Sequence, residues 1–168
     1  MDALRLRRGT AADAPELART MQLGFESYRE FAPEGWTPPP PEEEHLRARL
    51  ADPQVWCLVA ESGAGMAGHV ALLPASVHRV PDPDPEVAHL WQLFVRERHW
   101  GGGLAAALHA AALKEASARG FASMRLFTAA PHRRAARFYE REGWVAAGAA
   151  EDDLGFGMPL LTYRRRLP

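Results

Sequence analysis

Residues 95–108 carry the strongest structural signal of the chain and read Val95-Arg96-Glu97-Arg98-His99-Trp100-Gly101-Gly102-Gly103-Leu104-Ala105-Ala106-Ala107-Leu108. The apolar run 87–95 predicts a buried strand before the glycines, and the alanine- and leucine-rich run 104–118 predicts a helix after them. Three consecutive glycines permit positive φ angles and place no side chain in the way of a ligand. The first helical amides lack intrahelical partners and lie at the positive end of the dipole. The segment therefore predicts a strand–turn–helix unit that binds an anion such as a diphosphate.

Glycine triplets also occur in plain tight turns, so other phosphate-binding templates have to be compared with this one. A phosphate-binding loop of the Walker type ends in Gly-Lys-Ser/Thr, which is absent after Gly103. A dinucleotide fold places its glycines after an early strand, with an acidic residue about twenty positions further on. Neither template matches the sequence.

The segments around the turn predict an α/β (α+β) arrangement. Leu4 and Leu6 alternate with arginines, as in a half-buried strand, and a helix that includes Asp13 follows. The prolines at 33 and 38–41 predict an irregular loop. Further expected strands are 55–61, 66–73, 124–127, 144–147 and 158–167, and further expected helices are 42–50 and 133–141. The alternation of strands and helices after residue 87 implies at least one parallel crossover unit.

The bulk composition limits the class of protein. With 168 residues, of which 47% are hydrophobic and 24% charged, we expect one soluble globular domain spanning residues 1–168. A formal net charge of −1 provides no global positive field, so neither nucleic acid nor a membrane is an expected partner. The N-terminal residues lack the apolar core of a secretory signal, and no stretch is long enough to span a bilayer. We therefore expect a cytoplasmic protein.

Cysteine and histidine usage gives no indication of a metal site. Cys57 is the only cysteine, so a disulfide or a thiolate cluster within one chain is excluded, and its apolar neighbours indicate a buried, inert thiol. The histidines are scattered without the paired spacing of metal ligands. We expect no metal cofactor.

Residues 100–105 resemble motif A of the GNAT acetyltransferase family, whose pattern is Gln/Arg-x-x-Gly-x-Gly/Ala. Gly103 and Ala105 match the last two specified positions, whereas Trp100 occupies the place of the usual Gln or Arg. Diphosphate binding would then rest on backbone amides. The resemblance assigns this role to Gly101, Gly102, Gly103, Leu104 and Ala105.

Residues 137–144, Arg137-Phe138-Tyr139-Glu140-Arg141-Glu142-Gly143-Trp144, are similar to motif B of the same family, commonly Phe-Tyr-Glu-x-x-Gly-Phe. The resemblance covers nearly the whole chain. It implies a mixed, mostly antiparallel sheet of about six or seven strands flanked by about four helices, with a central parallel strand pair that splays to admit the cofactor. It also implies an N-acetyltransferase that uses acetyl-coenzyme A (acetyl-CoA) in a ternary complex.

The resemblance implies a role for several single residues. The pantetheine arm of the cofactor would run along the strand before the turn, which gives Leu93, Phe94 and Val95 as contacts. Tyr139 matches the tyrosine that acts as general acid towards the thiolate, and a phenol is protonated at neutral pH. The alternative reading of Tyr139 is core packing.

Two histidines occupy places where relatives carry other polar residues. His89 lies where many relatives have a glutamate base, although a strand histidine is often only a structural group. His132 lies where relatives place an asparagine that contacts the cofactor, and a helix cap is its alternative role. Arg133 and Arg134 could meet the adenosine phosphates, but solvated surface arginines are the commoner explanation.

The acceptor side is expected at the first two helices, the loop that joins them and the last hairpin, because relatives build their acceptor pocket there. The residues at those places are Phe25, Tyr28, Phe31, Trp36 and Asp152. Aromatic faces and carboxylates both favour an amine, so a small-molecule amine is the expected partner. The aromatic residues also fit an ordinary core. Peptide or protein amines, a non-catalytic acyl-CoA-binding regulatory module, and a homodimer remain open alternatives.

Overall fold

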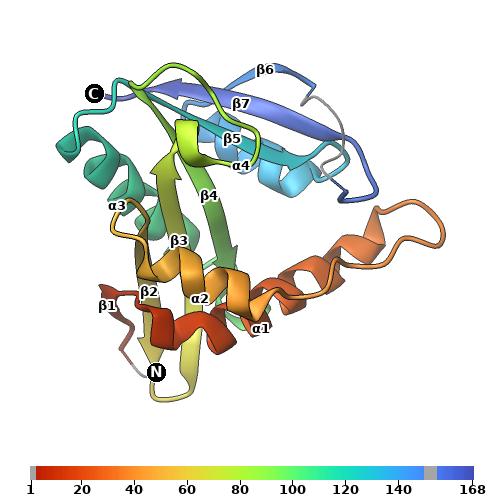
Figure 1. Cartoon of the computed structure of the whole chain (residues 1–168). Helices are drawn as coiled ribbons and strands as arrows, with labels where there is room; N and C mark the ends of the chain where they lie inside the picture. The colour runs from red at the N-terminus through yellow and green to blue at the C-terminus, as the bar shows by residue number, and fades with distance from the viewer. Residues whose placement is uncertain (1–2, 150–154) are drawn as a thin grey trace.

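The fold is built on a seven-stranded mixed sheet whose strand order is β1-β2-β3-β4-β5-β7-β6 (Figure 1). The computed structural model describes residues 3–149 and 155–168. Within them the strands are β1 Arg5–Arg8, β2 Trp56–Ser62, β3 Gly65–Pro74, β4 Val87–Val95, β5 Ser123–Ala129, β6 Val145–Ala149 and β7 Leu160–Arg166. Among the strand pairs of the described residues, only β4–β5 is parallel. This arrangement confirms the expected mixed, mostly antiparallel sheet.

In the part of the chain that the structure describes, four α-helices cover the two faces of the sheet (Figure 1). They are α1 Ala14–Glu26, α2 Glu43–Ala51, α3 Leu104–Ala118 and α4 Arg133–Arg141. α1 and α2 bury Leu17 and Leu46 against β2 and β3 on one face, whereas α3 buries Leu108 in the larger core on the other face. Leu17 of α1 and Leu108 of α3 therefore face the sheet.

The central parallel pair separates after only three residue pairs. Val87, Ala88 and His89 of β4 pair with Ser123, Met124 and Arg125 of β5. Both strands continue beyond these pairs, β4 to Val95 and β5 to Ala129, without further pairing between them. The predicted splay of the two strands is therefore confirmed.

A β-bulge in β4 lies next to the point of separation. Leu72 of β3 pairs with Leu90, but Ala71 pairs with Gln92, so Trp91 is an additional residue in β4. A bulge of this kind bends a strand and increases its twist. It re-aims β4 just where the strand leaves β5.

Beyond the bulge, alternate peptide groups of β4 point into the gap. The amide of Arg96 donates to the carbonyl of Ala67 on the β3 side at 2.8 Å. Because hydrogen-bonded pairs alternate along an antiparallel ladder, Phe94 also directs its peptide groups to β3, whereas Leu93 and Val95 direct theirs away. The gap side of β4 thus offers the N–H and C=O groups of Leu93 and the N–H group of Val95, whose C=O accepts a hydrogen bond of 2.7 Å from Nε1 of Trp100.

The N-terminal strand differs from the half-buried strand that its alternation predicts. β1 is an edge strand that pairs only with β2, and Leu4 and Leu6 are 42% and 46% exposed.

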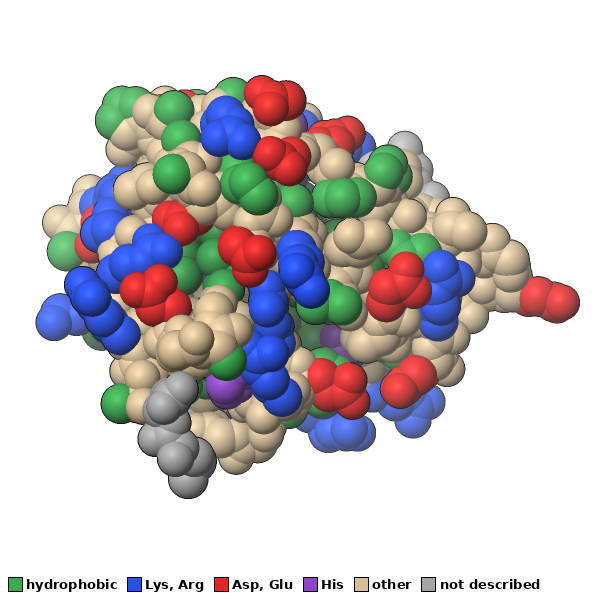
Figure 2. Space-filling view, turned by 90° about the horizontal axis from the view of Figure 1, so that it is seen from below, with side chains coloured by type: hydrophobic (Ala, Val, Ile, Leu, Met, Phe, Trp, Pro, Cys, Tyr) green, Lys and Arg blue, Asp and Glu red, His purple; other side chains and the backbone are tan. Residues whose placement is uncertain are grey.

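On the face shown in Figure 2, basic and acidic side chains are interspersed, with a short row of basic side chains near its centre.

Candidate active site

The glycine turn joins β4 to α3 and leaves amides free at the helix start. Gly101 and Gly103 adopt φ angles of 76° and 81°, which residues with a Cβ rarely adopt. The amide of Ala107 donates to Gly103 O at 3.0 Å, so the amides of residues 104–106 have no carbonyl of their own helix to bind. These three amides form the positive end of a 15-residue helix. The turn can therefore solvate an anion.

A cavity of about 490 Å³, here called the turn cavity, opens beside these amides. It is bounded by the glycine turn, the end of β4, the end of α1 and one face of α4. Of the predicted cofactor residues, its lining includes Leu93, Phe94, Val95, Gly101, Gly103, Leu104, Ala105 and His132. Gly102 does not line the cavity, although both of its neighbours do.

Three arginines of α4 line the turn cavity; the sequence suggested a phosphate contact for Arg134 but favoured a surface role, and it gave no role to the other two. Arg134, Arg137 and Arg141 are spaced three and four residues apart, so they share one face of α4. Within residues 3–149 and 155–168, no acidic side chain lines this cavity. The spacing along a predicted helix was the signal for this basic face, but the sequence alone did not place that face opposite the glycine turn.

A second cavity of about 660 Å³, here called the side cavity, lies between α1, the proline loop, β4 and β5. Its lining includes Met21, Phe25, His45, Trp91 and Phe127. The two cavities share six lining residues, namely Tyr28, Leu93, Phe94, His132, Ala135 and Tyr139. The cavities therefore adjoin at the place where Tyr139 lies.

The predicted acceptor residues divide into two groups. Phe25 and Tyr28 line the side cavity, and Tyr28 also lines the turn cavity. Phe31 and Trp36 line neither, which corrects the expectation for them. Trp36 is 9% exposed and donates from Nε1 to the carbonyl of Phe156 at 2.7 Å, because it closes a small aromatic core under the loop. Asp152 lies outside the described residues.

Tyr139 is the ionisable side chain of motif B at the junction of the cavities. Its ring packs edge-on against Phe138 and Trp144 at centroid distances of 5.3 and 5.9 Å. Burial raises the pKa of the Tyr139 phenol above its usual value, since the ionised form would lose its hydration. The phenol is therefore protonated at neutral pH and can act as a proton donor.

His89 is held by a neighbouring cation. It is 2% exposed, and its Nδ1 accepts a hydrogen bond of 3.1 Å from Nε of Arg125. Burial lowers the pKa of His89 well below its usual value, and the nearby His78 and Arg125 add to the effect. Because Arg125 carries the proton of this bond, the neutral imidazole has its own proton on Nε2. His89 therefore has no free basic nitrogen.

Two further histidines of the side cavity are fixed in the same way. His78 Nδ1 accepts from the amide of Val80 at 3.0 Å, and His132 Nδ1 accepts from the amide of Ala135 at 3.4 Å. Burial lowers the pKa of both imidazoles to about 4. These rings are neutral at pH 7 and present an Nε2–H donor, so His132 is both a helix cap and a donor at the junction.

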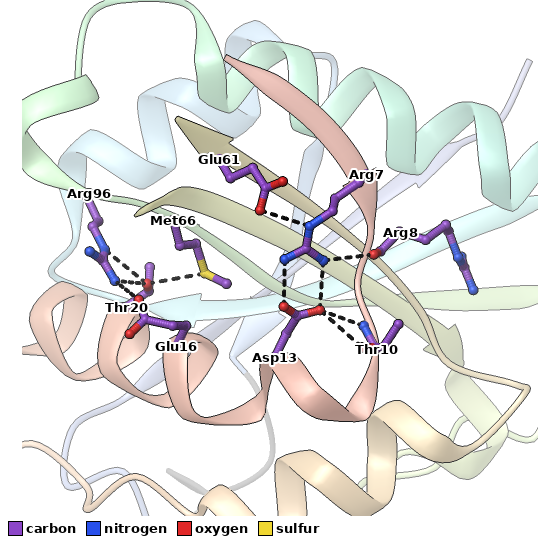
Figure 3. Close-up of polar contacts among 9 residues, drawn as sticks. All are labelled: Arg7, Arg8, Thr10, Asp13, Glu16, Thr20, Glu61, Met66 and Arg96. Atoms are coloured by element: carbon purple, nitrogen blue, oxygen red, sulfur yellow. Dashed lines mark hydrogen bonds and ion pairs between the residues drawn. The ribbon is translucent and has the colours of Figure 1, made fainter. Parts of the chain in front are cut away.

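The helix α1 is fixed against the end of β4 by Arg96 (Figure 3). This arginine directly follows β4, donates to Thr20 Oγ1 at 3.1 and 3.2 Å, and pairs with Glu16 at 2.8 Å. One turn further along α1, a Cβ on Gly24 would lie 2.5 Å from Cδ1 of Phe94. The close approach at Gly24 lets the helix backbone form a wall of the turn cavity.

The start of α1 is tied to the sheet by a second cation (Figure 3). Arg7 of β1 contacts Asp13 at 2.7 Å and Glu61 of β2 at 2.9 Å. The hydrogen bond from Arg7 holds the pKa of Asp13 below its usual value. The helix therefore has polar anchors at its start and in its middle, and both position it relative to the cavities.

Two kinds of feature are absent from residues 3–149 and 155–168. No helix there is long and apolar enough to cross a membrane. No group of three or more metal-ligating side chains was found among the same residues.

Comparison with known proteins identifies the family. A search of curated proteins found no match. Among solved structures, an acetyltransferase from Thermus thermophilus is 24% identical with a TM-score of 0.68, and the alignment covers 99% of this chain and 100% of that one. A GCN5-related N-acetyltransferase from Kribbella flavida is 21% identical with a TM-score of 0.72 and 98% coverage of both chains. The PaiA N-acetyltransferase from Thermoplasma acidophilum, solved in complex with coenzyme A, is 16% identical with a TM-score of 0.73, covering 98% and 99%. Residues 21–144 match the model of the acetyltransferase (GNAT) family, and the chain therefore belongs to that family.

Proposed function

We propose that this acetyltransferase transfers the acetyl group of acetyl-CoA to a primary amine of a small molecule, with both substrates bound at once. The observation that carries the proposal is the junction of the two cavities at Tyr139. One cavity begins at a diphosphate-binding turn, and the other is large enough for a small organic molecule. The reacting groups would meet where the cavities adjoin.

The residues of the turn cavity fit coenzyme A. The free amides of residues 104–106 suit the diphosphate, and the peptide group of Leu93 and the N–H of Val95 suit the amides of the pantetheine arm. The arginines on α4 add positive charge. The coenzyme A complex of the Thermoplasma acidophilum structure, which has the same fold, supports the assignment.

Tyr139 has the properties of a general acid at this junction. Acetyl-CoA, when bound, would supply a thioester whose carbonyl carbon is attacked by the amine while the thiol leaves. The Tyr139 phenol keeps its proton at neutral pH because burial raises its pKa, so it can donate to a sulfur beside it. An outward amide of β4, at Leu93 or Val95, can polarise the carbonyl.

The side cavity suits an amine with an apolar body. Its lining combines Phe25, Trp91 and Phe127 with Glu42, the one carboxylate that the described residues contribute. Aromatic faces and a carboxylate both attract an ammonium group. A volume of about 660 Å³ favours a small molecule over a folded protein segment as acceptor.

Removal of the amine proton is assigned to solvent, His45 or Glu42 in the side cavity, because the other histidines of that cavity are engaged. The imidazoles of His78, His89 and His132 each use Nδ1 as an acceptor and carry their proton on Nε2. None of the three is free to take a proton. We therefore give His89 a positioning role in place of the general-base role that the sequence suggested. In this role it orients the side chain of Arg125, which belongs to β5.

A paired measurement tests the function. Calorimetry measures coenzyme A binding, and release of free thiol from acetyl-CoA measures turnover with three acceptor sets: small primary amines, peptides with a free N-terminus, and peptides with an internal lysine. We expect coenzyme A binding and the fastest turnover with small amines. Preferred turnover of peptides would contradict the small-molecule assignment. Binding without turnover on any acceptor would indicate an acyl-CoA-binding module instead.

A further inference from the structure

Two residues far apart in the sequence stack across the turn cavity. The guanidinium carbon of Arg134 lies 3.3 Å from the centre of the Trp100 ring. Trp100 immediately precedes the glycine turn, whereas Arg134 is the second residue of α4, and both side chains line the cavity. A guanidinium over an indole face is the strongest common form of cation–π contact. The stack joins the two walls between which a diphosphate would bind.

The indole of Trp100 is itself fixed by a hydrogen bond. Its Nε1 donates to the carbonyl of Val95 at 2.7 Å, so the ring is tied to the end of β4. This bond uses the only polar group of the indole. Trp100 therefore cannot donate to a phosphate as the usual Gln or Arg of motif A would, but it offers a rigid flat surface next to Gly101.

The guanidinium of Arg134 is available to an anion. Among the described residues, no carboxylate lies within ion-pairing distance of it, and Glu30 and Glu97 act on it only from further away. Burial lowers the pKa of Arg134, because the cavity wall removes part of its hydration. A partly desolvated guanidinium whose face is stacked still presents its edge N–H donors, which match phosphate oxygens.

We propose that Arg134, held on the face of Trp100, binds the diphosphate of coenzyme A and supplies from α4 the side-chain contact that motif A lacks in this chain. The inference rests on the proposed function, because it concerns the same cofactor. Trp100 acts as a positioning residue. Arg137 and Arg141 lie further along α4 and extend the basic wall away from the turn.

The test compares three ligands that differ in their phosphates. Coenzyme A carries the diphosphate and the 3′-phosphate, 3′-dephospho-coenzyme A carries the diphosphate alone, and pantetheine carries neither. For Arg134→Gln we expect Kd to rise ~10- to 100-fold for the first two ligands by the same factor, as for lost charged hydrogen bonds, and pantetheine binding to be unchanged. Arg133→Gln is the matched control, because Arg133 is exposed like Arg134 but does not line the cavity.

The role of Trp100 is tested by the same titrations. Trp100→Leu removes the stacking surface and should raise Kd for coenzyme A by ~2- to 5-fold, whereas Trp100→Phe should recover most of the loss. The double variant Trp100→Leu/Arg134→Gln should bind within about twofold of Arg134→Gln alone, because the two residues act as one unit. High salt should weaken coenzyme A binding less in Arg134→Gln than in the wild type.

Several results of these titrations would overturn the proposal for Arg134. A loss confined to coenzyme A would assign Arg134 to the 3′-phosphate, and an equal loss for pantetheine would indicate a structural role; both overturn the proposal. Unchanged or tighter binding in Arg134→Gln would also overturn it, the latter by indicating a barrier across the cavity. If the wild type and Arg133→Gln bind no coenzyme A, the proposed function itself fails.

Discussion

Nε of Arg125 lies 3.1 Å from Nδ1 of His89, so the histidine is the acceptor of a bond whose donor is always charged. The ring is buried, and a second N–H of Arg125 binds the carbonyl of Val80. His89 thereby orients Arg125 between β4 and β5 at the last pair before the strands separate. This geometry favours a structural use of the residue that the sequence placed at the position of a base.

For His89→Gln we expect an unchanged pH dependence of kcat/KM, with a rate reduced by less than about tenfold, because a glutamine carbonyl can still accept from Arg125. The measurement is a pH–rate profile of both proteins between pH 5.5 and 9. His89→Ala, which leaves Nε of Arg125 without its acceptor, should be less stable than His89→Gln. Loss of the acidic limb in His89→Gln would restore the residue as the base.

For Tyr139→Phe we expect kcat to fall by about 100-fold, in the usual range for a lost general acid, while Kd for coenzyme A stays within about twofold. Steady-state kinetics and calorimetry provide the two values. Tyr163→Phe is the control, since its hydroxyl contacts Glu140 at 3.3 Å and lines neither cavity. Equal rates for Tyr139→Phe and wild type would remove Tyr139 from the chemistry.

For Gly24→Ala we expect weaker cofactor binding and a net loss of stability of at most about 2 kcal/mol. The new methyl would lie 2.5 Å from Cδ1 of Phe94, so the ring must move at the junction of the cavities. Overpacking costs about 1–3 kcal/mol, whereas replacing a helical glycine by alanine contributes about 1 kcal/mol of stability. Calorimetry should show Kd for coenzyme A raised at least about fivefold. Leu23→Ala, at an exposed position of the same helix, should bind normally.

Stability should fall steeply as the pH drops from about 6.5 to 5. Burial lowers the pKa of His69, His109 and His132 to about 4, and that of His89 well below its usual value. Below pH 6.5 the unfolded chain takes up protons that the folded chain does not, and each such histidine costs up to ~1.4 kcal/mol per pH unit. Urea unfolding should lose on the order of 3 kcal/mol or more over this range. A flat profile would mean that these rings ionise in the folded protein.

The sequence was sufficient for the elements with strong local signals. The bounds of α3 and α4 agree with the expected 104–118 and 133–141, because alanine content, glycine stops and motif spacing act locally. The splay of β4 from β5 followed from the family resemblance. These predictions needed no knowledge of which residues meet across the fold.

The missed residues depend on contacts between distant segments. The sequence could not separate Arg134 from Arg133 as a phosphate contact, because only the fold places Arg134 opposite Trp100, 34 positions earlier in the chain. Trp36 is of a residue type that is common in binding sites, but its Nε1 donates to the carbonyl of Phe156 and the side chain belongs to the core. Leu4 and Leu6 alternate correctly, yet an edge strand leaves them partly in solvent. Periodicity identifies the apolar face of a helix or strand but not which other element packs on that face.

The short contact between β4 and β5 has a mechanical consequence. Because three residue pairs join them, the sheet consists of two half-sheets, β1 to β4 and β5 to β7 with β6, hinged at one end. A molecule that spans the open end would contact the glycine turn on one half and α4 on the other, and would thereby link the two half-sheets. A bound ligand should then slow amide exchange in both half-sheets together, because it holds the separated ends of β4 and β5 at a fixed distance.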